Sequence, residues 1–77
     1  MKKSEIKIGC IYSNGRGRAR KVVDIGPQYK LYDGQASTEN LRYEIIVDGS
    51  KSNRTAGQQG NMTLVAFANW AKERQGE

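Results

Sequence analysis

Two segments of the chain alternate apolar and polar residues with a period of two. Residues 41–47 show the clearest alternation, and residues 6–12 show a second one. Because successive side chains of a β-strand point to opposite faces of a sheet, this pattern predicts two strands that each bury one face in a core. The apolar positions are Ile6, Ile8, Cys10 and Tyr12 in one segment, and Leu41, Tyr43, Ile45 and Val47 in the other.

A basic segment, residues 14–21 with the sequence NGRGRARK, separates residues 6–12 from the apolar-rich residues 22–25. Its initial Asn-Gly favours positive φ and predicts a hairpin tip, so that residues 22–25 return as an antiparallel second strand. A strand at this point argues against a glycine-rich dinucleotide loop, which is followed by a helix. Gly26-Pro27 ends the second strand, and we expect a short third strand over residues 29–32.

Two polar segments interrupt the pattern. Residues 35–40 are expected to form a loop, and residues 48–61 are almost entirely glycine, polar and charged residues. The longer segment has too little apolar area to offset the entropy cost of ordering it, so we expect a mobile excursion there. Long loops in small domains are often functional, which makes residues 48–61 a candidate interaction segment.

The C-terminal region has the periodicity of an amphipathic helix, with apolar residues at i, i+3, i+4 and i+7 from Leu64 onward. Thr63 is a suitable N-cap, and the helix is expected to run to about Arg74, with Gly76 beyond its end. Trp70 is expected to pack in or beside the core. The helix should cover the sheet face formed by Leu41, Tyr43, Ile45 and Val47.

Length and element order together predict the fold class. A chain of 77 residues forms one domain with a single small core. Strands joined by tight turns and followed by one helix predict a mostly β fold, a small SH3-like antiparallel barrel that covers residues 1–77. A five-stranded OB-like barrel is the alternative.

The residue content disfavours several kinds of site. Cys10 is the single cysteine and histidine is absent, so we expect no metal or cofactor and a buried, inert thiol. No apolar run could span a membrane and the N-terminus does not resemble a signal peptide, so we expect a cytoplasmic protein without a membrane partner. No acid–base–nucleophile constellation is visible, and we expect no enzyme activity.

Positive charge is concentrated at the start of the chain. The net charge is +5, with +6 in residues 1–21 and −1 in the remainder. Such a patch is typical of a surface that binds a polyanion, although many small proteins carry a similar excess for solubility alone.

The candidate nucleic-acid-binding residues belong to this patch and to the segment after it. If the second strand begins early, its alternate arginines share one face, and such a row suits contacts with a phosphate backbone. Tyrosines beside a turn can stack on bases or pack against the protein. The predicted set is Arg16, Arg18, Arg20, Lys21, Tyr29 and Tyr32, and simple solvation of the charged side chains is the competing interpretation.

Several motifs resemble those of small phage and prophage accessory proteins. That group begins with a strand pair of the form vGxiY, NxxG and RxVxxI and closes with a capped helix that contains FxxWA. The resemblance implies an SH3-like fold and an origin in a mobile element, and it implies no activity and no functional residue. The matching segments are residues 7–12 (KIGCIY), 20–23 (RKVV), 41–43 (LRY), 62–63 (MT) and 67–71 (FANWA).

Two functions of different class follow from these features. The first is a phage or mobile-element accessory module whose basic hairpin binds nucleic-acid phosphates. The second is a protein-interaction module, such as a phage-encoded inhibitor of a host or defence protein, that uses the same hairpin, residues 48–61, or both. Salt distinguishes them, because phosphate binding weakens steeply as salt rises and an interface with an apolar centre responds less.

Overall fold

The computed structural model describes residues 1–35 and 39–76. Its elements in chain order are a short 3₁₀ helix η1 (Lys3–Glu5), strands β1 (Ile11–Ser13), β2 (Arg18–Ile25), β3 (Asn40–Asp48) and β4 (Gln59–Thr63), helix α1 (Leu64–Trp70) and strand β5 (Glu73–Gly76). None of the helices in this described part is long and apolar enough to cross a membrane.

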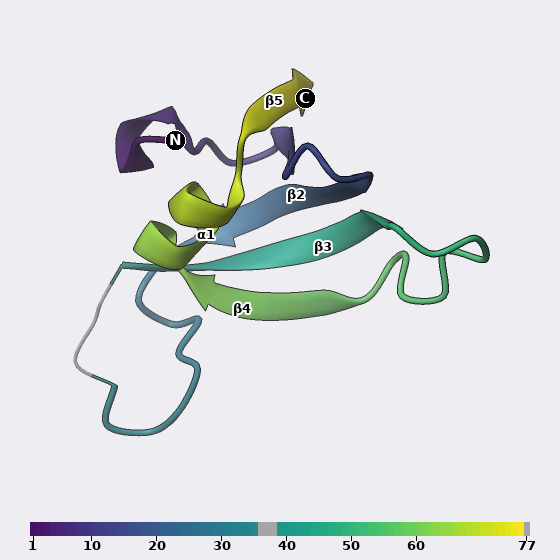
Figure 1. The fold of residues 1–77 in the computed structure, drawn as a ribbon. Coiled ribbons are helices and arrows are strands. Elements are labelled where there is room, and N and C mark those ends of the chain that lie inside the picture. Colours follow the sequence, from purple (N-terminus) through teal and green to yellow (C-terminus); the bar gives the residue numbers. More distant parts are fainter. Residues whose placement is uncertain (36–38, 77) are drawn as a thin grey trace.

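The strands form one five-stranded antiparallel sheet in the order β4-β3-β2-β1-β5. Strands β4 and β5 are its two edges and do not pair with each other within the described residues, so the sheet stays open. Helix α1 lies against one face near one end, while the β1–β2 turn and the β3–β4 loop project at the other end (Figure 1). The prediction of a mostly β chain with antiparallel strands and a C-terminal helix is confirmed in this form, and β5 follows the helix.

The core forms between α1 and the helix-facing side of the sheet. Phe67 is fully buried, and its ring meets the buried Tyr12 ring edge-on at a centroid distance of 5.6 Å. The Trp70 ring lies 5.4 Å from Phe67 at the edge of this cluster, as expected for a core-edge residue. The buried apolar members are Ile6, Cys10, Tyr12, Val22, Leu41, Phe67, Ala68 and Ala71.

The predicted face for the helix is only half right. Leu41 is fully buried in the core and Tyr43 packs against it, with its ring 6.5 Å from Phe67. Ile45 and Val47 are not core residues, and Val47 is 38% exposed. A register shift between Ala19 and Arg20 interrupts the pairing of β2 with this part of β3, so the simple alternation ends before Val47.

The first strand is much shorter than residues 6–12. Gly9 has a φ of +87°, so the chain turns there, Ile8 is left 57% exposed and regular pairing begins at Ile11. The Tyr12 hydroxyl fixes the preceding segment, since it donates to the Glu5 carbonyl (2.7 Å) and accepts from the Lys7 amide (2.8 Å). The buried position of Cys10 is confirmed, although outside a strand.

The predicted third strand over residues 29–32 is wrong. This segment forms a loop that is fastened to other parts of the chain by side chains rather than by a strand ladder. The Tyr29 hydroxyl donates to Asp24 (2.5 Å), and the Asn61 side chain donates to the Lys30 carbonyl (3.2 Å). Of the predicted loop 35–40, residues 36–38 lie outside the described residues and Asn40 belongs to β3.

The predicted excursion over residues 48–61 ends in a strand, because Gln59–Thr63 form β4 along β3. Thr63 caps α1 as predicted, since its hydroxyl accepts the Ala66 amide at 3.1 Å. The helix stops at Trp70 instead of Arg74, and the chain continues as β5 beside β1.

Candidate functional site

The β1–β2 turn presents Arg16 at its tip. Gly15 and Gly17 both have a φ of +78°, a conformation that glycine adopts without the strain other residues would carry. The Asn14 side chain accepts the Arg16 amide at 2.9 Å, which closes the turn locally. The predicted hairpin tip is thus confirmed, but β2 begins only at Arg18, so the exposed Arg16 precedes the strand.

Arg18 lies at the start of β2, opposite Asp48 at the end of β3. Its side chain is exposed and its stem lies over Gly49, where an added Cβ would be 3.2 Å from the Arg18 Cγ. The β1–β2 turn and the β3–β4 loop therefore share one end of the sheet. Two further exposed cations of that loop, Lys51 and Arg54, join Arg16 and Arg18 there, and we call this group the basic end.

Arg20 is placed differently from the other predicted cations. Its guanidinium carbon lies 4.6 Å from the centre of the Tyr43 ring and 4.5 Å from that of the Trp70 ring. One of its N–H groups also points at the Met62 sulfur, at 3.3 Å. Arg20 thus links β2, β3, β4 and the last turn of α1, and it is half-buried rather than free in solvent.

The remaining predicted site residues do not join Arg18 and Arg20. Lys21 is adjacent to Arg20 in β2 and so points to the opposite face of the sheet. Tyr29 and Tyr32 follow β2 in the chain, and Tyr29 bonds to Asp24 near the far end of β2, about 20 Å from Arg18 at the usual rise of a strand. Tyr29 is also engaged, because Arg42 lies over its ring at 5.1 Å and the hydrogen bond to Asp24 raises the pKa of its hydroxyl. Tyr32 is 65% exposed.

Asp48 organises the β3–β4 loop. One carboxylate oxygen accepts the Ser50 amide (2.7 Å) and hydroxyl (2.6 Å), and the other accepts the Thr55 amide (2.7 Å) and hydroxyl (3.0 Å). These bonds, that from the Ser50 hydroxyl above all, hold the pKa of Asp48 well below its ordinary value of 3.8. The start of the predicted excursion is therefore closed by side-chain hydrogen bonds that composition alone did not reveal.

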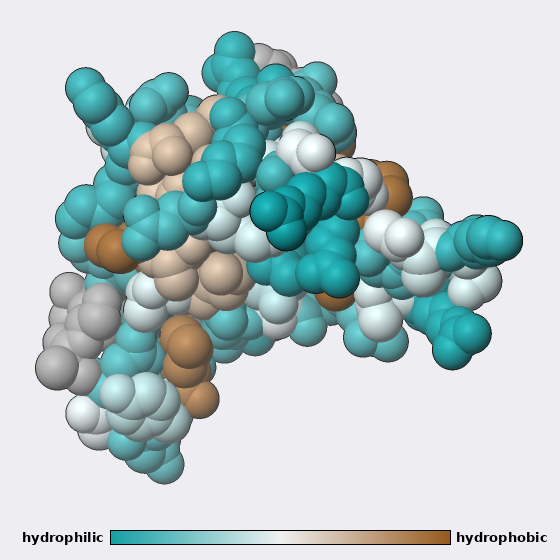
Figure 2. All heavy atoms as spheres, viewed as in Figure 1, coloured by the Kyte–Doolittle hydropathy of each residue, from teal (hydrophilic) through white to brown (hydrophobic). Residues whose placement is uncertain are grey.

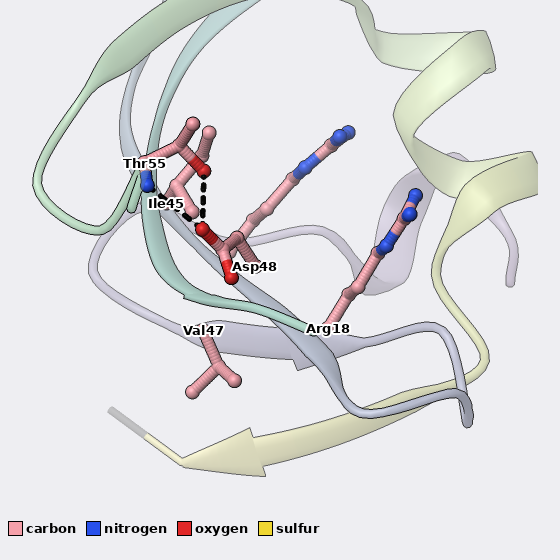
Figure 3. Close-up of a pocket in the computed structure, with 6 residues that line it drawn as sticks. Arg18, Ile45, Val47, Asp48 and Thr55 are labelled. Carbon is pink, nitrogen blue, oxygen red and sulfur yellow. Dashed lines mark hydrogen bonds between the residues drawn. The ribbon is translucent and has the colours of Figure 1, made fainter. Parts of the chain in front are cut away.

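Two hollows flank Arg18. The first, which we call the arginine hollow, has a volume of about 200 Å³, and the second has about 430 Å³. Figure 3 shows the Arg18 side chain extending toward the α1 side, whereas Val47 points the opposite way. The arginine hollow is lined by Arg18, Arg20, Ile45, Val47, Asp48 and Thr55, and the second by Ser13, Gly15, Gly17, Arg18, Ala19, Val47, Glu73 and Gln75.

The cations of the basic end form no ion pair with an acid within the described residues, where the one ion pair joins Lys3 to Glu39 at 2.8 Å.

Strongly hydrophilic side chains gather over the sheet to the right of α1 and on the projecting β3–β4 loop (Figure 2). Lys51 and Arg54 were missed as site residues from sequence, because only the pairing of Arg18 with Asp48 brings their loop to the hairpin tip.

Across the described residues, no cluster of cysteine, aspartate and glutamate side chains could hold a metal ion. Comparisons with protein-family models, with curated proteins and with solved structures gave no match to this chain. The site must therefore be interpreted from its own chemistry, which is that of exposed guanidinium and ammonium groups beside two shallow hollows.

Proposed function

We propose that this chain is a small accessory module that binds the phosphates of nucleic acid through its basic end. The observation that carries the proposal is that the β1–β2 turn and the β3–β4 loop place four exposed cations at one end of the sheet, without an ion pair to any described acid. These cations are Arg16, Arg18, Lys51 and Arg54. Unpaired surface cations attract a polyanion and release its counterions on binding. Two N–H groups of one arginine guanidinium can also donate to two oxygens of the same phosphate.

Two acids lie beside this group, because Asp48 and Glu73 each line a hollow next to Arg18, and they offset part of its charge. Neither forms an ion pair within the described residues. Each carboxylate oxygen of Asp48 accepts two hydrogen bonds from the β3–β4 loop, and Asp48 forms no ion pair with Arg18. The carboxylate instead shapes the loop that carries Lys51 and Arg54.

Contacts between these cations and phosphates would orient the protein on the nucleic acid without distinguishing the bases. The affinity should therefore be similar for oligonucleotides of different sequence.

The strand order supports the SH3-like arrangement over the OB-like one as part of this proposal. A meander of β1 to β4 whose first strand also pairs with β5 is the order found in SH3-like barrels. The origin in a phage or mobile element rests only on the motif resemblance given above.

A protein-interaction module is the second candidate. The exposed apolar side chains favour it, since Leu31 is 49% exposed beside Tyr32 on the loop after β2, away from the basic end. A partner held there would be insensitive to changes at Arg16 and Arg18, and its binding would depend less on salt.

Fluorescence anisotropy with labelled single- and double-stranded oligonucleotides tests the proposal. The variant Arg16→Gln/Arg18→Gln should bind more weakly than wild type. The matched control Lys2→Gln/Lys30→Gln removes the same charge from exposed positions outside the basic end and should retain most of the affinity. Equal losses in the two variants would mean that only net charge matters and that the basic end is not the site.

A further inference from the structure

Arg20 lines the arginine hollow, and its guanidinium is held over two aromatic rings. The Tyr43 and Trp70 rings lie at 4.6 and 4.5 Å from its guanidinium carbon, and both rings also contact Phe67 in the core. A cation stacked on two anchored rings has few rotamers left, so it loses little further entropy when a ligand binds.

The guanidinium keeps donors for a ligand. Its one hydrogen bond is the weak one to the Met62 sulfur, and it forms no ion pair within the described residues. No buried side-chain nitrogen or oxygen in that part of the chain lacks a partner, so the Arg20 nitrogens without a partner keep some contact with solvent. A guanidinium offers five N–H donors in a planar fork, which suits an oxyanion.

Arg18 supplies a second guanidinium at the same hollow. The two residues are separated by one position in β2, and both line the arginine hollow, together with the hydrogen-bonded Asp48 and Thr55. Their roles differ, because Arg18 is exposed with its stem over Gly49, whereas Arg20 is stacked on two rings.

We propose that Arg20 and Arg18 together bind a single phosphate group of the nucleic-acid strand in the arginine hollow, with Arg20 as the fixed donor. This inference rests on the proposed function and adds to it one defined anchoring point among otherwise diffuse contacts. Arg20 would then bind the ligand as well as stabilise the fold, and its stack on Trp70 would hold the guanidinium in place for binding.

Trp70 is the only tryptophan of the chain and reports directly on Arg20, so its fluorescence is the readout. Titration with an oligonucleotide should change the Trp70 emission with the same midpoint as the anisotropy signal. Inorganic phosphate, used alone, should produce the same kind of change at much higher concentration. Arg20→Lys keeps the charge but loses the fork and should weaken oligonucleotide binding by about tenfold, whereas Arg74→Lys, at an exposed position outside the basic end, should have little effect.

Circular dichroism and thermal melting establish that Arg20→Lys is folded, and Arg18→Lys provides a second variant at the hollow that leaves the stack intact. Oligonucleotide binding without a change in Trp70 emission, and with both lysine variants equal to wild type, would overturn the anchor while leaving the proposed function standing. An emission change with inorganic phosphate but not with oligonucleotide would also overturn it, because the hollow would then take a free anion. Absence of oligonucleotide binding to wild type at low salt would end both proposals.

Discussion

The guanidinium of Arg20 stacks on the Trp70 ring at 4.5 Å and thereby ties strand β2 to the last turn of helix α1. The short helix depends on such contacts, since its seven residues are too few to be stable alone. Arg20→Met keeps most of the side-chain stem but removes the cation. It should lower the free energy of unfolding by about 1 kcal/mol in urea denaturation, whereas Arg18→Met at an exposed position should cost less than about 0.5 kcal/mol. Equal costs would show that the stack does not stabilise the fold.

Phe67 is the residue on which the core depends most. It is fully buried and contacts the rings of Tyr12, Tyr43 and Trp70. Phe67→Ala should cost about 3–5 kcal/mol, a large share of the stability of so small a domain, and should leave the chain largely unfolded. Val65→Ala, at a half-exposed position of the same helix, is the control. An unchanged melting temperature for Phe67→Ala would contradict the described core.

Gly60 in β4 has no room for a side chain because the Tyr43 ring lies over it. A Cβ at this position would be 2.7 Å from the Tyr43 hydroxyl oxygen and 2.9 Å from the ring carbon that bears it. Gly60→Ala should therefore destabilise the protein by about 1–3 kcal/mol, measured by urea denaturation. The cost should shrink in a Tyr43→Ala background, and a cost that does not depend on residue 43 would rule out the clash as its cause.

Asp48 should make stability depend on acid pH. Its folded pKa is below the ordinary value of 3.8, so the unfolded state binds the proton more readily. The carboxylate therefore contributes its stabilisation fully above pH 3.8, and that contribution is lost as the pH falls below this value toward the folded pKa. The melting temperature of the wild type should fall between a pH above this value and a pH below it, and the fall should be smaller in Asp48→Asn. Asp33→Asn, in an exposed loop, should show the same fall in melting temperature as the wild type.

The sequence predicted those elements whose formation depends on residues that are close together in the chain. Residues 41–47 alternate, and β3 forms there, with Leu41 buried in the core and Tyr43 packed against it. Thr63 caps α1 because the bond from Ala66 lies within one helical turn. The turn at Gly15 likewise follows from its backbone freedom.

The missed elements depend on partners that are distant in sequence. Strands β4 and β5 consist largely of polar residues and exist because they pair with β3 and β1. The candidate site shows the same limit. In the sequence Arg20 does not differ from its basic neighbours. Only the fold brings the rings of Tyr43 and Trp70 to it and fixes it in a stack. Lys51 and Arg54 became candidates only through the strand register.

The salt dependence of oligonucleotide affinity is the most direct measurement of the central claim. Wild-type protein titrated against labelled oligonucleotides between about 50 and 200 mM salt should lose affinity steeply, with log K falling linearly with log salt. The variant Arg16→Gln/Arg18→Gln should bind more weakly, and its slope should be flatter by roughly one unit for each phosphate contact removed. Absence of wild-type binding even at the lowest salt concentration would contradict the account and leave the protein-interaction module as the better interpretation.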